Sequence, residues 1–532
     1  MDTVEWSEQA KRLTYGTLKE TILSGSTGTS DTVPLHGGLP PDEGLPIQSM
    51  TLKLYNGETV EIPMTMGQQQ YNVPAIGYEP LRSWCEAHTK RQHGVTADHS
   101  NANDTTTMIT DSTTHALDAA TSVLLNPGDS VLIEEYTVRR RRAHDHVPRI
   151  TYPSPLTSHL SLLTAHCSPL TAHRSPRAHL HPIQYCHFTD CTVERQGYKP
   201  LSVPMDEGGI TPEGLERVIL ERIELSKRAE MRSLAHGEPS SVVGNGKQHN
   251  GIRCPTPEKS ERKTGHKHLI PRVLYIIPTA QNPTGCSYTE SRRRAIYAIC
   301  QRYDIIIIED DPYHYLQFNL GERINLPDQP GQPGLYDLVS HSFLSMDVDG
   351  RVVRLDSFAK FLAPGFRLGW ATGPRSIIDK MAMKIHSATL GGNMMCQSIV
   401  SNILTHWGDA GLDAYVSRMQ GLYANKAAAA LSALEAHMKD FATWRTPVGG
   451  MFVWIRLLHH KDAREFFQRL KSAGVIVMPG HVSLAEKTDA DGNTKFCPHI
   501  RISFSYISAE AIADGIRRIA DTYRALYPPT SK

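Results

Sequence analysis

Four consecutive isoleucines, Ile305–Ile308, open the segment IIIIEDDPYHYL and constrain the fold of this 532-residue chain more than any other feature. A strand with apolar side chains on both faces must be covered on both faces, which is typical of a parallel sheet between layers of helices. Other apolar runs, RVLYIIP and RVVRL, are separated by helical patterns such as TESRRRAIYAICQRYD. This alternation predicts βαβ units and an α/β fold with a mainly parallel sheet.

The length exceeds what one hydrophobic core usually serves, so we expect more than one domain. The predicted organisation is an N-terminal arm over residues 1–65 that also contributes to the small domain, a large domain over 66–385, and a linking helix with a smaller α/β domain over 386–532. One long helical stretch is expected from MKIHSATLGG to LEAHMKD. Two segments interrupt the large domain: 138–192, a low-complexity stretch of Ser, Pro, Leu, Thr and His, and 228–268, a polar loop.

Composition and charge argue against several classes of protein. A net charge of +1 gives no reason to expect a nucleic-acid partner or an anionic membrane surface. No apolar run is long enough for a transmembrane helix, and the N-terminal residues carry neither a secretory nor a transit pattern. Nine scattered cysteines without a Cys-x-x-Cys pair indicate reduced thiols and a cytoplasmic protein. The histidines of segment 138–192 are irregularly spaced, so no metal site is expected.

Polar residues follow several of the apolar runs at the point where each predicted strand ends. Asn282 follows RVLYIIP, Asp310 and Tyr313 follow the isoleucines, and Ser357 and Lys360 follow RVVRL. Taken singly, each has an ordinary explanation, such as a turn asparagine, a capping aspartate or a solvated lysine. The carboxyl ends of parallel strands meet at one sheet edge, where ligands bind, so the convergence of these residues predicts a site.

The set suits pyridoxal phosphate, which needs a lysine amine for its Schiff base, a carboxylate at its ring nitrogen, donors to its phenolic oxygen and an anion cradle. Lys360 would supply the amine and act as base and acid in proton transfer, and Asp310 would supply the carboxylate. Asn282 and Tyr313 would bond the phenolic oxygen. The phosphate would be bound by the side chains of Ser357 and Arg367 and by the backbone N–H groups of Ser112, Thr113 and Thr114 at the start of a helix.

Four motifs, YIIPTAQNPTG, IIIIEDDPYHYLQF, DSFAKFLAPGFRLGW and HIRISFS, resemble the fold-type I, class I/II aminotransferases. The resemblance is greatest to the aromatic-amino-acid and 2-aminoadipate/kynurenine branch, including its fungal aromatic members, and it covers residues from about 36 to 137 and from about 196 to 525. It implies a homodimeric enzyme that moves an amino group from an aromatic or 2-aminoadipate-like L-amino acid to a 2-oxo acid such as 2-oxoglutarate.

The resemblance also implies roles for further residues. Arg501 in HIRISFS would bind the substrate α-carboxylate, which suits the forked geometry of a guanidinium group. Gly38 and Phe452 would line the substrate pocket, and Tyr71 would reach the phosphate from the other subunit of the dimer.

The chain departs from the family pattern at two places. The phosphate turn reads DSTTH without the family's glycine, so the resemblance does not fix its geometry. The tyrosine that stacks on the cofactor ring is missing after VLIEEYT. Tyr152 in TYPSPL would supply it if 138–192 is a genuine insertion. We favour instead a retained intron or gene-model error, because a disordered insert beside an active site carries a large entropic penalty.

Other functions stay open at this stage. Another reaction of the same cofactor, such as a lyase or decarboxylase reaction, would use the same residues. An inactive aminotransferase-like protein would follow if segment 138–192 disrupts the site. A transcription regulator would need a basic helix-turn-helix domain before the fold, and an arm of about 60 residues does not provide one.

Overall fold

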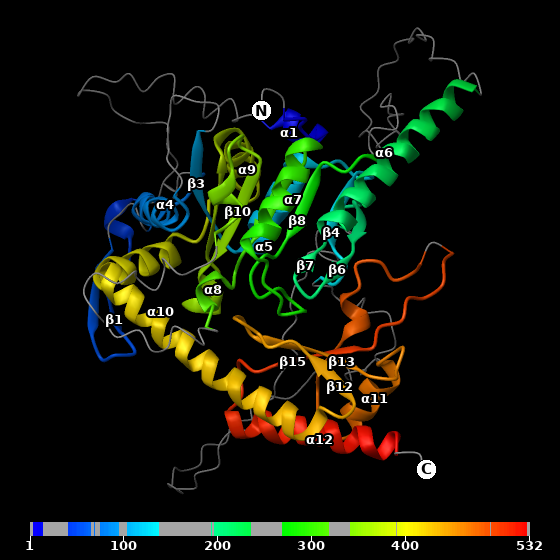
Figure 1. Cartoon of the computed structure of the whole chain (residues 1–532). Helices are drawn as coiled ribbons and strands as arrows, with labels where there is room; N and C mark the ends of the chain where they lie inside the picture. Colours follow the sequence, from blue (N-terminus) through cyan, green and yellow to red (C-terminus); the bar gives the residue numbers. More distant parts are fainter. Residues whose placement is uncertain are drawn as a thin grey trace, which may run out of the picture.

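The computed structural model describes residues 4–13, 41–64, 69, 75–94, 104–137, 193, 196–235, 269–318, 341–389, 391–489 and 491–528. These residues form two larger sheets and two two-stranded ones. The larger sheets have seven and four strands, and the four-stranded sheet faces the end of the seven-stranded one that carries α8 (Figure 1). Segment 138–192 and the residues Gly38, Tyr71 and Tyr152 lie outside the described part of the chain.

The large sheet has the order β3-β11-β10-β9-β8-β4-β5. Only β11 runs antiparallel to its neighbours β3 and β10, while the other pairings are parallel. This confirms the predicted α/β fold with a mainly parallel sheet. The strands are β3 (Thr105–Thr110), β4 (Ser130–Glu134), β5 (Lys199–Val203), β8 (Val273–Ile276), β9 (Ile306–Asp310), β10 (Val352–Ser357) and β11 (Gly369–Pro374).

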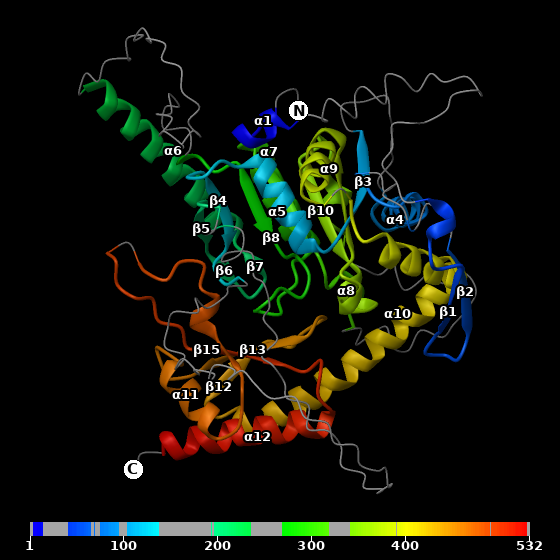
Figure 2. The ribbon, with the colours of Figure 1, turned by 180° about the vertical axis from the view of Figure 1, so that it is seen from behind.

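Helices cover both faces of the large sheet, as the isoleucine run requires. Helices α5 and α9 lie on one face of the sheet, and α6 and α7 lie on the other (Figures 1 and 2). Side chains of alternate strand residues pack against these two layers. None of the described helices combines the length and hydrophobicity needed to cross a membrane. The helices that cover the two faces are α4 (Glu79–His93), α5 (Thr113–Leu124), α6 (Pro212–Ala235), α7 (Glu290–Arg302) and α9 (Arg375–Thr389).

The small sheet is antiparallel, with the order β12-β13-β15-β14. Helix α10 runs from the large sheet down to the small one. Helix α12 packs against the lower part of α10, below the small sheet (Figure 1). The elements are α10 (Met394–Met438), β12 (Ala442–Trp444), β13 (Phe452–Leu457), α11 (Arg464–Ser472), β14 (Met478–Pro479), β15 (His499–Ser503) and α12 (Ala509–Leu526).

Backbone hydrogen bonds join the two sheets along two seams. In the first, Thr137 N donates to Ser483 O (2.8 Å) and Ala485 N donates to Glu135 O (2.9 Å). In the second, Gly450 N donates to Leu316 O (3.0 Å). The two sheets are therefore linked at two separate places.

The N-terminal arm contributes one short helix and one hairpin to the described structure. Helix α1 (Glu8–Arg12) lies on the end of α5, where Ser7 N donates to Val123 O (2.9 Å). The hairpin of β1 (Ser49–Lys53) and β2 (Thr59–Pro63) packs against the first turns of α10. The expected share of this arm in the small domain, and the domain boundaries, stay predictions.

Short elements complete the chain. They are the 3-10 helices η1 (Asp42–Gly44), η4 (His314–Leu316), η6 (Leu344–Met346), η7 (Pro364–Phe366) and η8 (Gly480–Ser483), the strands β6 (Met205–Asp206) and β7 (Gly209–Ile210), and the one-turn helix α8 (Phe358–Phe361).

Two expected boundaries differ from the structure. The long helical stretch is interrupted between α9 and α10, because Gly391 has φ 136° and a Cβ at Gly392 would lie 2.9 Å from Asp111 Oδ1. Helix α6 continues to Ala235, eight residues into the expected polar loop, and 236–268 lies outside the described residues. The side chains there favour helix, and Arg228 pairs with Glu224 one turn earlier (3.1 Å).

Gly369 provides a test of how tightly the strand ends are packed. A Cβ there would lie 2.5 Å from Asp356 O and 3.3 Å from Thr113 N. Gly369→Ala should therefore destabilise the protein by about 1–3 kcal/mol through overpacking. Thermal unfolding would measure the loss. Gly365→Ala is the matched control, since a Cβ at that position meets nothing within 4 Å. Equal stability of the two variants would contradict the packing argument.

Candidate active site

The register of the large sheet brings several predicted site residues to one edge. Ser357 at the end of β10 is paired with Gly369 at the start of β11, which is paired with Thr110 at the end of β3. Asp310 at the end of β9 is paired with Leu355 of β10. The segments after β3, β9 and β10 and before β11 therefore emerge side by side.

The phosphate turn forms without the glycine of the family pattern. Ser112 has φ 168° and ψ 166°, which is extended backbone that any residue adopts. Its Oγ accepts from His115 N (3.2 Å) and caps α5, so Thr113 and Thr114 open the helix as expected. N–H groups of a first helical turn have no intrahelical partner, and together they suit an anion.

Lys360 lies on α8, which Ser357 caps by accepting from Ala359 N (3.1 Å). Its Nζ is 6.0 Å from the centroid of the Tyr313 ring. Burial lowers the pKa of Lys360, and the positive charges of Arg367 and Arg501 lower it further, while Asp310 opposes the shift. A lowered pKa increases the fraction of neutral amine, which is the nucleophilic form.

One carboxylate oxygen of Asp310 accepts a hydrogen bond within the described structure, and the other does not. Its Oδ2 accepts from the Tyr275 hydroxyl (2.8 Å), whereas its Oδ1 is buried and has no hydrogen-bond partner among the described residues. Burial raises the pKa of Asp310 to about 7, against the lowering effect of the Tyr275 hydrogen bond. An unused buried acceptor beside a lysine fits the protonated ring nitrogen of pyridoxal phosphate, which would donate to it.

Arg501 brings the small sheet to this site. Its Nη1 donates to Asn282 Oδ1 (2.5 Å), and its guanidinium carbon lies 4.0 Å from the centroid of the Phe452 ring. Phe452 in turn contacts the edge of Tyr313, with 6.1 Å between ring centroids. The structure therefore joins five of the predicted residues in one continuous set, since Tyr313 also lies beside Lys360. The predicted bond from Asn282 to the phenolic oxygen stays a prediction.

Buried residues that sequence reasoning missed hold the loop that carries Asn282. Glu134 at the end of β4 accepts from Gln281 Nε2 (2.9 Å) and from the Tyr288 hydroxyl (2.8 Å). Gln281 Nε2 also donates to Tyr136 O (2.6 Å). Tyr275 was missed as well. The available signal was the position of Glu134 and Tyr275 in apolar strands, because a polar group buried there needs a partner.

The aromatic ring that would stack on the cofactor is not assigned by the described residues. Tyr136 is the last aromatic before segment 138–192, and its ring packs edge-on against Trp454 and His499, at 5.4 and 5.5 Å between centroids. The predicted roles of Tyr152, Tyr71 and Gly38 lie outside the described residues. No group of metal-ligating side chains occurs within the described ranges.

Comparison with known proteins extends these observations. Residues 259–519 match the family model described as aminotransferase class I and II. The mitochondrial kynurenine/alpha-aminoadipate aminotransferase of Rattus norvegicus is 28% identical over 508 residues, which cover 94% of each chain. An aromatic amino acid aminotransferase of Schizosaccharomyces pombe is 27% identical over 485 residues, covering 86% of this chain and 82% of the relative.

Solved structures share the fold. The aminotransferase Aro8 of Candida albicans superposes with a TM-score of 0.69 and 23% identity, over 98% of this chain and 97% of the other. A kynurenine aminotransferase of Pyrococcus horikoshii, solved in complex with pyridoxamine phosphate, gives a TM-score of 0.60 over 98% of both chains at 24% identity. The family match, the relatives and the shared fold together identify the chain as a pyridoxal-phosphate-dependent aminotransferase.

The ionisation of Glu134 gives a pH-dependent prediction. Burial raises its pKa from 4.5 to about 8, so its contribution to stability is full below pH 4.5 and is lost as the pH rises through 8. Glu134→Gln removes this titration. Between pH 5 and 8.5 the wild type should lose on the order of 1–3 kcal/mol relative to this variant. Chemical denaturation at several pH values would measure it, with the exposed Glu435→Gln as control. Parallel pH curves for wild type and Glu134→Gln would contradict the assignment.

Proposed function

We propose that this aminotransferase moves the amino group of an aromatic or 2-aminoadipate-like L-amino acid to a 2-oxo acid such as 2-oxoglutarate. The proposal rests on one observation: Lys360 is buried within electrostatic reach of both Asp310, with its unused Oδ1, and Arg501, with its forked guanidinium. Retention of this set favours an active enzyme over an inactive aminotransferase-like protein.

Separate residues would bind the cofactor, bind the substrate and transfer the proton. Bound pyridoxal phosphate supplies a carbonyl group and an electron-withdrawing ring. Asp310 Oδ1 would hold the ring nitrogen, and the first turn of α5, with Ser357 and Arg367, would hold the phosphate. Arg501 binds and orients the α-carboxylate of the substrate through two parallel hydrogen bonds. The Lys360 amine, with its lowered pKa, then removes the proton from the substrate α-carbon.

The substrate class is inferred from the pocket and from the relatives. Phe452, beside Arg501, offers an aromatic face to a substrate side chain. The relative from Schizosaccharomyces pombe is described as an aromatic amino acid aminotransferase, and the rat relative as acting on kynurenine or alpha-aminoadipate. These names support, for this chain, a substrate with a large side chain.

Assembly and location belong to the same proposal. A homodimer is inferred from the resemblance that assigns Tyr71 to the partner's site, and light scattering on the purified protein tests it. A cytoplasmic location is supported by the five cysteines of the described residues, all of which are free thiols, and cell fractionation tests it.

Lys360→Ala tests the cofactor chemistry. The variant should lose the visible absorbance of lysine-bound pyridoxal phosphate and the cofactor that borohydride fixes to the protein. Its turnover should fall by a factor of at least about 10²–10⁴, because it loses its general base. Absorbance spectra and mass spectrometry of the reduced protein measure both losses. The exposed Lys471→Ala should behave as wild type. A colourless wild type that takes up no cofactor would refute the proposal.

Arg501→Lys tests substrate recognition. A lysine keeps the positive charge but loses the fork, so KM should rise by a similar factor, roughly 10- to 100-fold, for every amino acid. Steady-state kinetics with phenylalanine, tyrosine, kynurenine, 2-aminoadipate and aspartate, each with 2-oxoglutarate, measure this. Arg456→Lys, on the same sheet but exposed, is the control. A wild-type preference for aspartate would contradict the proposed substrate class.

A further inference from the structure

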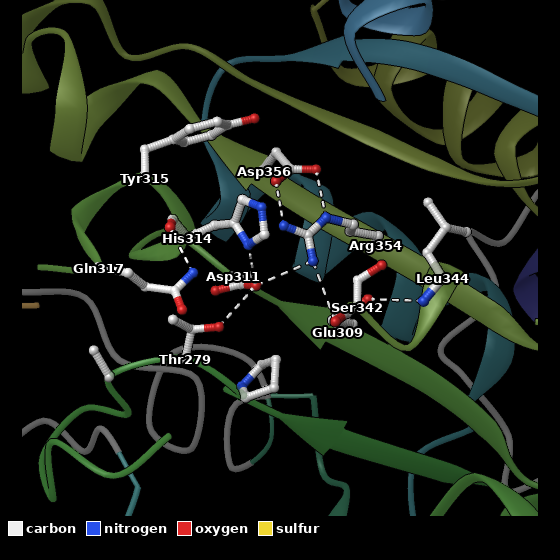
Figure 3. Close-up of polar contacts among 12 residues, drawn as sticks. Thr279, Glu309, Asp311, His314, Tyr315, Gln317, Ser342, Leu344, Arg354 and Asp356 are labelled. Atoms are coloured by element: carbon white, nitrogen blue, oxygen red, sulfur yellow. Dashed lines mark hydrogen bonds and ion pairs between the residues drawn. The ribbon is translucent and has the colours of Figure 1, made fainter. Parts of the chain in front are cut away.

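Figure 3 shows a buried cluster of charged side chains around Arg354. The cluster lies on the face of the large sheet opposite to Asp310, because Arg354 and Asp356 flank Leu355, which is paired with Asp310. Its centre is Arg354, which is fully buried on β10. Arg354 Nε and Nη2 donate to the two carboxylate oxygens of Asp356, at 3.0 and 2.8 Å. Its Nη1 donates to Asp311 Oδ2 (3.1 Å) and lies 3.2 Å from Glu309 Oε1. One guanidinium group thus contacts three carboxylates, one on β10, one on β9 and one directly after β9.

Asp311 extends the cluster to a third chain segment. Its Oδ2 also accepts from the Thr279 hydroxyl (3.1 Å) and lies 3.3 Å from His314 Nδ1. Burial would raise the pKa of Asp311, but the positive charge of Arg354 and the contact with His314 hold it below its usual range. Asp311 is therefore a permanent anion at the junction of the three segments.

Each member of the cluster is a near neighbour in sequence of a residue assigned to the cofactor. Thr279 is three positions before Asn282. Asp311 directly follows Asp310. Asp356 directly precedes Ser357 and is four positions before Lys360. The cluster makes no use of these residues themselves, because successive residues of a strand face opposite sides of a sheet.

We propose that Arg354 is a positioning residue that fixes the three cofactor-facing segments relative to one another through this cluster. Its planar fork holds two carboxylates at fixed angles, which a single point charge cannot reproduce. Positional errors of about 1 Å in a catalytic set are enough to lower rates 100-fold, so a rigid link behind the set has functional value. The proposal rests on the assignment of Lys360 and Asp310 to pyridoxal phosphate.

Arg354→Lys tests the proposal, and Arg351→Lys is the matched control. Arg351 is a buried arginine at the other end of the same strand, with Nη2 2.6 Å from Asp349 Oδ2. Both variants lose a buried fork and should lower the unfolding temperature. Only Arg354→Lys should weaken pyridoxal phosphate binding, by at least fivefold in Kd measured by absorbance titration.

Hydrogen–deuterium exchange of the cofactor-free proteins provides a second readout. Arg354→Lys should accelerate amide exchange at least fivefold in all three segments, 279–284, 311–316 and 356–361. Arg351→Lys should accelerate exchange only near 347–352. This comparison needs no bound cofactor, so a wild type that binds none would refute the proposed function and leave the exchange test intact.

Thr279→Val covers the case in which Arg354→Lys does not fold. It removes the hydrogen bond to Asp311 and a longer one from Arg293 Nη2 to the Thr279 hydroxyl (3.4 Å), and it leaves the ion pairs of Arg354 in place. Exchange should then increase in 279–284 and 311–316 and stay at the wild-type rate in 356–361. The proposal is overturned if Arg354→Lys leaves exchange and Kd unchanged, if Arg351→Lys changes them equally, or, when only the threonine variant folds, if its exchange is unchanged.

Discussion

The alternation of side chains along one buried strand organises the site. Strand β9 is covered by helices on both faces. The polar side chains at its end are therefore buried on both faces, and each needs a partner there. Asp310 turns to the face of α5 and keeps one oxygen unused, whereas Asp311 turns to the opposite face and is neutralised by Arg354. Two adjacent carboxylates buried together on one face would repel each other strongly. Placing them on opposite faces permits one to serve a ligand while the other serves the scaffold.

Much of this arrangement could be predicted from the sequence because it depends on local patterns. Ile305–Ile308 required a sheet covered on both faces, and a parallel sheet aligns the carboxyl ends of its strands. Lys360, Asp310 and Asn282 follow such ends, so their convergence was predictable. The start of α5 was predictable from its sequence pattern, and the structure shows that the turn before it forms without the family's glycine, since Ser112 is extended.

The remaining features depend on contacts between residues far apart in sequence. Arg501 meets Asn282 across 219 positions, and no local pattern encodes that distance. Glu134 and Tyr275 appeared only as polar interruptions of apolar strands, and their partners depend on the strand order. The break at Gly391 was missed because helical periodicity continues on both sides of it, while the packing of Gly392 against Asp111 is a tertiary effect. Helix α6 extends further than predicted, because the polar residues from 228 to 235, which favour helix, were interpreted as the start of a loop.

The two seams of backbone hydrogen bonds between the sheets have a thermodynamic consequence. Thr137 is bonded to Ser483 in the first seam, and Gly450 is bonded to Leu316 in the second. Separating the sheets would expose these backbone groups together with the Arg501–Asn282 contact, so neither sheet can melt without removing partners from the other. The small sheet is therefore expected to unfold in one cooperative unit with the large sheet, and the Arg501–Asn282 contact should be lost only when the whole protein unfolds.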